Sequence, residues 1–177
     1  MKRIVLTGGG TAGHVTPNLA LIPHLAAAGW DIVYIGSVGG MERGLVEPTG
    51  VPFYEVATGK LRRYRDLKNL SDPFRVLKGT AQAAALMGKL RPNVVFSKGG
   101  FVSVPVVYGA ALHGVPVVLH ESDLTPGLAN KLCAPFAKAV CTTFPETAKA
   151  VRHGVYTGTP LRDELFAGQR KSGLAAF

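Results

Sequence analysis

The chain has 177 residues, of which 47% are hydrophobic and 18% are charged, and its mean hydropathy is +0.21. This composition excludes a disordered chain, and the length suits one domain with a sizeable core. The net charge of +9 favours an anionic partner, so nucleic acid, an acidic membrane surface and a phosphorylated substrate are the classes to weigh.

The cellular setting follows from the termini and the cysteines. The charged start at Lys2 and Arg3 leads into a run too short for a secretory leader, and no apolar run approaches the roughly 20 residues that span a bilayer. With only Cys133 and Cys141 present, we expect a reducing cytoplasm in which both cysteines are buried free thiols.

Short Val- and Ile-rich runs without polar alternation predict strands that are buried on both faces of a parallel sheet. These strands are expected at residues 4–6, 32–35, 52–56, 94–97, 117–120 and 139–142. Helices are expected between them, at residues 17–28, 41–47, 73–89, 104–112, 127–133 and 145–152. This alternation predicts an α/β fold with a Rossmann-like, doubly wound parallel sheet that binds ligands outside the carboxyl ends of its strands. We expect one domain over residues 1–165 and the start of an interdomain linker at 166–177, where the chain becomes polar and small.

The first glycine loop runs from Gly8 to His14, between the first strand and the first helix. Glycines let a ligand approach the backbone, and the amides of a helix N-terminus favour an anion such as phosphate. The G-x-G-x-x-G spacing also fits a dinucleotide site, but Asp31 lies at the wrong end of the second strand to bind a ribose. We therefore predict a phosphate or sugar site. A nucleotide-dependent oxidoreductase and a turn without a ligand remain alternatives.

The second glycine turn, from Ser97 to Pro105, again follows a strand and opens a helix. Two such turns on neighbouring strands are expected to bind a diphosphate from two sides, with Lys98 adding a charge. Ser103 provides either a hydroxyl for the ligand or a helix cap.

The third motif, from His120 to Asp123, follows the fifth predicted strand. His, Glu and Asp within four residues resemble a set of metal ligands, but a loop scatters their directions and no second cluster accompanies them. We expect neither a metal nor a cofactor. Glu121 or Asp123 is instead predicted to recognise a hydroxyl group or to act as a general base.

Residues 60–78 are basic and carry interleaved apolar residues at loosely helical spacing. This pattern predicts contact with an anionic membrane surface, and a solvated loop before an amphipathic helix is the alternative. The predicted membrane-contact residues are Arg62, Arg63, Tyr64, Leu67 and Phe74. No recognised nucleic-acid motif is present in the sequence, so nucleic acid is not expected as a partner.

Four motifs together resemble the N-terminal half of the MurG family of glycosyltransferases. They are residues 8–17, 99–105, 120–123 with 127–131, and 158–162, and their order and spacing cover essentially the whole chain. The resemblance implies a GT-B architecture, in which an N-terminal domain binds the lipid-linked acceptor and a C-terminal domain holds most of UDP-GlcNAc. It implies an inverting transfer of GlcNAc to the C4 hydroxyl of MurNAc in lipid I, forming lipid II for peptidoglycan without an obligatory metal.

The resemblance also implies roles for single residues. Thr11, Ala12 and Gly13 match contacts to the donor, and His14 matches the histidine proposed as the general base. Its position at a helix N-terminus predicts a lowered pKa. Arg162, after the Gly-x-Pro turn, matches a contact to the nucleotide-sugar. The other candidates are Glu121 as a catalytic residue and Gly99, Gly100, Ser103, Asp123 and Asn130 as substrate-binding residues. Which of His14, Glu121 and Asp123 takes the proton stays open.

The family's enzymes carry a second, donor-binding half that is not seen in this sequence. We therefore expect this chain alone to be inactive or nearly so, and to lie peripherally at the cytoplasmic face of the cell membrane. The alternative is a stand-alone, membrane-associated subunit of a two-chain glycosyltransferase that recruits a separate donor-binding chain.

Overall fold

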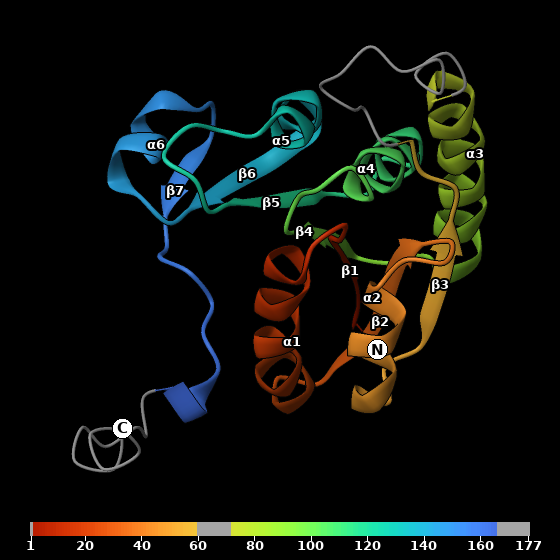
Figure 1. Cartoon of the computed structure of the whole chain (residues 1–177), viewed down its shortest axis with the longest axis horizontal. Helices are drawn as coiled ribbons and strands as arrows, with labels where there is room; N and C mark the ends of the chain where they lie inside the picture. Colours follow the sequence, from red (N-terminus) through yellow and green to blue (C-terminus); the bar gives the residue numbers. More distant parts are fainter. Residues whose placement is uncertain (1, 60–71, 166–177) are drawn as a thin grey trace.

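The computed structural model describes residues 2–59 and 72–165 of the chain. In this part of the chain, seven parallel strands form one sheet in the order β3-β2-β1-β4-β5-β6-β7 (Figure 1). The strands are β1 (Lys2–Thr7), β2 (Trp30–Ser37), β3 (Phe53–Val56), β4 (Val94–Ser97), β5 (Val117–Glu121), β6 (Ala137–Thr142) and β7 (Gly154–Tyr156). The order runs outward from β1 in one direction and from β4 in the other, so the predicted doubly wound topology is confirmed, with its switch point between β1 and β4.

Helices cover both faces of the sheet (Figure 1). They are α1 (Ala12–Ala27), α2 (Glu42–Val46), α3 (Asp72–Leu90), α4 (Ser103–Leu112), α5 (Leu128–Cys133) and α6 (Pro145–Ala150), with 3₁₀ turns η1 (Glu47–Thr49), η3 (Ala134–Phe136) and η4 (Asp163–Leu165). Helices α3, α4 and α5 pack on one face, α1 and α2 pack on the other, and α6 packs against β6 and β7.

Neighbouring residues of one strand enter two different cores. Val5 joins the core that contains Met87 of α3, whereas Leu6 joins the core that contains Val15 and Ile22 of α1. Successive side chains of a strand point to opposite faces, so an unbroken apolar run is the expected pattern for a sheet covered on both sides.

The start of α1 differs from the prediction. The helix begins at Ala12 rather than at Pro17, which lies inside the helix together with Pro23. His14 consequently lies in the first helical turn, next to the carboxyl end of β1. Proline at position 17 gives up a single backbone hydrogen bond near the helix start, and the buried side chains of Val15 and Pro17 hold this turn against the core.

Strand β7 was not predicted, because three residues with an exposed Val155 carry no strand pattern of their own. Its pairing comes from β6, in the register Cys141↔Val155. Cys133 is buried as predicted, whereas Cys141 is only half-buried, and both are free thiols.

Several predictions lie outside the described residues. Arg62, Arg63, Tyr64 and Leu67 of the predicted membrane-contact set fall there, as does the predicted linker at 166–177. Among the helices that the structure describes, none combines the length and the apolarity needed to cross a bilayer.

Candidate functional site

A cavity of about 270 Å³ lies where the loops after β1, β4 and β5 meet. It is lined by His14, Gly100, Phe101, Glu121, Asp123, Gly127, Leu128, Ala129 and Asn130. The loops converge here because β1, β4 and β5 are adjacent parallel strands, whose carboxyl ends share one edge beside the switch point. The fold thus brings together five of the predicted site residues, namely His14, Gly100, Glu121, Asp123 and Asn130.

The two glycine turns pack backbone against backbone. Gly100 has a φ of +80°, and a Cβ atom at this position would lie 2.2 Å from the carbonyl oxygen of Gly9. No ligand fits between Gly9 and Gly100 themselves, so the binding of a diphosphate by both turns stays a prediction for the rest of the two turns. The cavity opens on the other side of Gly100, between this turn and the loop after β5.

His14 presents a half-buried imidazole to the cavity. Its Nδ1 atom lies 2.9 Å from Oγ1 of Thr11. Desolvation by burial and the nearby Lys98 ammonium lower the pKa of His14, while Asp123 and Glu121 oppose this shift. The direction agrees with the prediction, and the imidazole is neutral over more of the physiological pH range than a free histidine.

Lys98, directly after β4, has a buried side chain whose ammonium donates a hydrogen bond to the hydroxyl of Ser122. Burial lowers the pKa of Lys98, although Glu121 and Asp123 favour its charged form. Lys98 therefore links the second glycine turn to the loop after β5 and places a cation next to the cavity.

Glu121 organises the loop after β5. One carboxylate oxygen accepts the N–H of Asp123 at 2.9 Å, and the other accepts the N–H of Gly127 and the side-chain amide of Asn130, both at 2.9 Å. The carboxylate is buried and three donors occupy it. Asp123, by contrast, is exposed at the cavity rim, and its carboxylate has no hydrogen-bond donor among residues 2–59 and 72–165.

Asn130 is held by its own amide group, which donates to the carbonyl of His120 at 3.2 Å as well as to Glu121. Its Oδ1 atom is buried without a hydrogen-bond partner among the described residues, and it faces Gly99. A buried acceptor without a partner is a candidate to accept a hydrogen bond from a ligand, because a missing hydrogen bond at a buried polar atom costs free energy.

The remaining predicted residues do not line the cavity. Ser103 is fully buried, and its hydroxyl donates to the carbonyl of Gly99 at 2.8 Å, so these two residues shape the second turn. Thr11, Ala12 and Gly13 are exposed at the start of α1.

Arg162 lies in the exposed segment that returns from β7 along α1 (Figure 1). Its neighbour Asp163 pairs with His24 at 3.6 Å, in the last turn of α1. The ten residues from His14 to His24 correspond to about 15 Å of helix, so the fold keeps Arg162 away from the cavity.

His120 joins the end of β5 to this returning segment. Its Nε2 atom lies 2.9 Å from the carbonyl oxygen of Gly158, and its Nδ1 atom is buried without a partner among the described residues. Burial is the main cause that lowers the pKa of His120. Within residues 2–59 and 72–165, no three His, Cys, Asp or Glu side chains lie close enough together to hold a metal ion.

Two residues that hold the first glycine loop, Tyr34 and Glu42, were not predicted from the sequence. The hydroxyl of Tyr34 donates to the carbonyl of Gly8 at 2.7 Å, and Glu42 accepts the N–H of Gly10 at 2.7 Å. Tyr34 lies in β2 and Glu42 lies in α2, and both elements are distant from the loop in sequence. Gly40 leaves room for this side chain, because a Cβ atom at that position would lie 1.8 Å from the Glu42 carboxylate.

Comparison with known proteins identifies the family of the chain. The family model for the glycosyltransferase family 28 N-terminal domain matches residues 4–142. A UDP-N-acetylglucosamine–N-acetylmuramyl-(pentapeptide) pyrophosphoryl-undecaprenol N-acetylglucosamine transferase from Lachnospira eligens is 59% identical over 176 residues, which cover 98% of this chain and 50% of that protein. A second enzyme of this name from Bacillus cereus is 58% identical over 177 residues, covering 99% of this chain and 50% of the relative.

A solved structure shows the same fold. The crystal structure of MurG from Acinetobacter baumannii superposes with a TM-score of 0.77 at 30% identity, covering 93% of this chain and 47% of that one. The chain therefore spans about half the length of the curated relatives that it matches. The resemblance to the MurG family is confirmed, and the chain belongs to the glycosyltransferase family 28 N-terminal domain family.

Proposed function

We propose that this chain is the acceptor-binding half of an inverting glycosyltransferase, which transfers GlcNAc from UDP-GlcNAc to the C4 hydroxyl of MurNAc in lipid I and so forms lipid II. The observation that carries the proposal is the placement of His14, a base with a lowered pKa, at a cavity beside a glycine loop that Glu121, Asp123 and Asn130 also line. The names of the relatives, N-acetylglucosamine transferases with a pyrophosphoryl-undecaprenol substrate, support the choice of donor and acceptor.

In this proposal, Nε2 of His14 takes the proton of the acceptor hydroxyl while that oxygen attacks the anomeric carbon of the donor sugar. The bond to UDP breaks as the new glycosidic bond forms, so the configuration inverts. Asp123 and the unpaired oxygen of Asn130 bind donors of the acceptor sugar. Glu121 keeps this loop in shape, because three protein donors occupy its carboxylate.

The membrane part of the proposal rests on α3. Phe74 and Leu77 are 75% and 69% exposed, one helical turn apart, and exposed Arg75 and Lys78 flank them. Exposed apolar side chains framed by cations match the surface of an anionic lipid bilayer. In this proposal, the protein lies peripherally at the cytoplasmic face of the cell membrane, where the lipid-linked acceptor is available.

Binding titrations test the acceptor role. A soluble lipid I analogue and UDP-GlcNAc are titrated separately into the folded chain, with Asp123→Ala as the cavity variant and Glu146→Ala, an exposed carboxylate of α6, as its control. We expect the analogue to bind, UDP-GlcNAc to bind far more weakly, and only Asp123→Ala to weaken the analogue. Tight binding of UDP-GlcNAc without binding of the analogue would show that the chain is the donor-binding half instead.

Turnover is tested in a two-domain fusion, in which this chain is followed by the unmatched second half of the Lachnospira eligens relative. We expect GlcNAc transfer to lipid I from the fusion and little or none from the chain alone. Transfer by the chain alone would contradict the assignment of the donor to the second half.

Vesicle sedimentation tests membrane contact. The double change Phe74→Ser with Leu77→Ser is expected to reduce binding to anionic vesicles. Val155→Ser, which is exposed on β7 at the opposite edge of the sheet from β3, is the matched control. Equal vesicle binding by the unchanged chain, the double variant and Val155→Ser would show that α3 does not contact the membrane.

A further inference from the structure

Glu42 places a fully buried carboxylate against the first glycine loop. Its Oε1 atom accepts the N–H of Gly10 at 2.7 Å, and the hydroxyl of Ser37 donates to its two oxygens at 3.3 and 3.1 Å. Glu42 is the first residue of α2, whereas Ser37 ends β2, so the side chain connects the end of β2 to the loop after β1.

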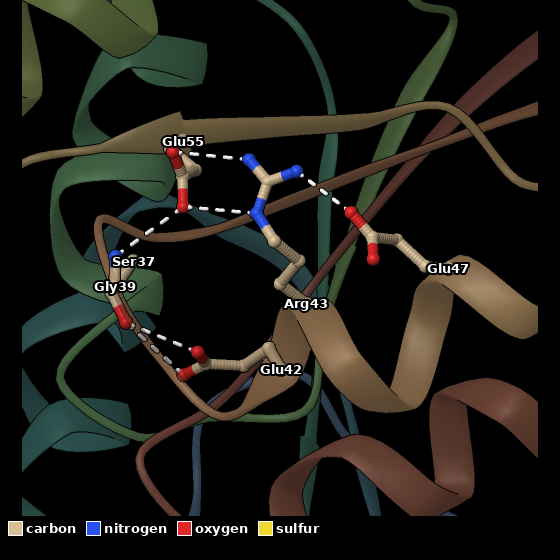
Figure 2. A network of polar contacts seen from close by, with 6 residues as sticks. All are labelled: Ser37, Gly39, Glu42, Arg43, Glu47 and Glu55. Carbon is tan, nitrogen blue, oxygen red and sulfur yellow. Dashed lines mark hydrogen bonds and ion pairs between the residues drawn. The ribbon is translucent and has the colours of Figure 1, made fainter.

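Glu42 has no cationic partner among residues 2–59 and 72–165. Figure 2 shows that its neighbour Arg43 points away from it, toward Glu47 and Glu55. The guanidinium lies 2.8 Å from Glu47 and 3.1 Å from Glu55. A carboxylate buried without a cation costs free energy. Stability of the fold alone therefore does not explain an acid at this position, and its contact with the loop is the feature to explain.

The glycines around Glu42 are shaped to admit it. A Cβ atom at Gly9 would lie 1.9 Å from one carboxylate oxygen, and a Cβ atom at Gly40 would lie 1.8 Å from the other. Any side chain at either glycine would displace the carboxylate from the loop. The sequence Gly8-Gly9-Gly10 thus serves an internal contact as well as the approach of a ligand.

The loop is held at two points from the same side. Tyr34 donates to the carbonyl of Gly8, and Glu42 accepts from Gly10, which has a φ of +86°. Thr11 follows as the N-cap of α1, and His14 lies in the first turn. The conformation of these three glycines determines where α1 starts, and hence where the imidazole of His14 lies relative to the cavity.

We propose that Glu42 is a positioning residue for His14, acting through its hydrogen bonds to Gly10 and Ser37. The inference rests on the proposed role of His14 as the base. Both hydrogen-bond donors are neutral groups, so an uncharged acceptor of the same shape preserves the arrangement, whereas truncation of the side chain releases the loop.

Nuclear magnetic resonance of this chain tests the positioning without catalysis. In Glu42→Ala, we expect the amide of Gly10 to exchange with solvent roughly tenfold faster, and the imidazole of His14 to titrate closer to its ordinary value. Glu42→Gln keeps both signals close to those of the unchanged chain, and Glu47→Ala, an exposed acid of the same region, leaves both unchanged. An unaltered His14 titration in Glu42→Ala, or a Glu42→Gln protein that behaves like Glu42→Ala, would overturn the proposal.

Ser37→Ala provides a second test if Glu42→Ala does not fold. It removes one donor to the carboxylate and leaves the carboxylate in place, so a smaller change of the same two signals is expected. No change in either signal would contradict the role given to this hydrogen bond.

Turnover of the two-domain fusion provides the functional readout. Glu42→Ala is expected to lower kcat by roughly ten- to a hundredfold with little change in the KM for the acceptor, because misplacing a base affects the transition state more than binding. Glu42→Gln restores most of this activity. If His14→Ala leaves turnover intact, the proposed function fails, while the resonance experiment still decides whether Glu42 positions His14.

Discussion

Oγ1 of Thr11 lies 2.9 Å from Nδ1 of His14, three residues further along. Thr11 is the N-cap of α1, but its side chain makes no capping hydrogen bond, so its hydroxyl is available to the imidazole. When the proton is on Nδ1 and is donated to Thr11, Nε2 is the unprotonated atom that a general base requires.

Replacing Thr11 with valine removes this hydroxyl and keeps the shape of the side chain. We expect kcat of the two-domain fusion to fall roughly three- to tenfold, the worth of one neutral hydrogen bond, with nearly unchanged stability because no helix cap is lost. Thr16→Val, an exposed threonine of the same helix, is the control. Equal kcat values for the two variants would show that Thr11 does not orient His14.

Removal of the imidazole is the more severe change. His14→Ala is expected to lower turnover of the two-domain fusion by roughly two to four orders of magnitude, the usual loss for a general base. His113→Ala, an exposed histidine after α4, is expected to leave turnover unchanged. Near-normal turnover of His14→Ala would show that His14 is not the general base and would favour Asp123 or Glu121 in that role.

The lowered pKa values of His14 and His120 predict a loss of stability in acid. As the pH falls below the ordinary value of 6.5, unfolded imidazoles bind protons before the folded ones do, so the free energy of unfolding decreases until the pH passes the folded pKa values. Urea denaturation between about pH 8 and pH 5 measures this slope.

The contribution of His120 to this pH dependence of the free energy of unfolding can be measured separately. His120→Gln keeps a donor for the carbonyl of Gly158 and removes the titration, so we expect a flatter dependence on pH. His113→Gln changes an exposed histidine and should retain the full slope. A slope that His120→Gln does not alter would exclude His120 as a source.

Close packing of the two glycine turns predicts a large effect of one methyl group. Gly100→Ala introduces a Cβ atom 2.2 Å from the carbonyl of Gly9 at a φ of +80°, and we expect a loss of about 1–3 kcal/mol from backbone strain alone. Gly44→Ala in α2 meets no atom within 4 Å and should instead stabilise the helix by about 0.5–1 kcal/mol.

Thermal or chemical unfolding of both variants checks this pair, and titration with the lipid I analogue checks the cavity. Weaker analogue binding is expected for Gly100→Ala only, since Gly100 lines the cavity and Gly44 does not. A Gly100→Ala protein as stable as the Gly44→Ala protein would contradict the backbone contact.

The sheet was predictable because its signals are local. Apolar runs such as residues 94–97, each bounded by turn residues, identify strands buried on both faces, and all six predicted strands are present. Strand β7 was missed because its three residues become a strand only by pairing with β6. The prediction began α1 at Pro17, but the helix begins at Ala12. The earlier start follows from the packing of Val15 in the core, which the local sequence pattern did not indicate.

The sequence by itself determined that polar residues and glycines follow the strands, which located His14, Asp123 and Asn130 at one edge of the sheet. Only the tertiary structure decided what each group does there: Glu121 is occupied by loop amides, Ser103 by a carbonyl, and the amide of Gly10 by Glu42. Backbone conformation depends on neighbours in the chain and can be inferred from a short stretch. Burial and hydrogen bonding depend on partners tens of residues away, and these meet only when the sheet is assembled.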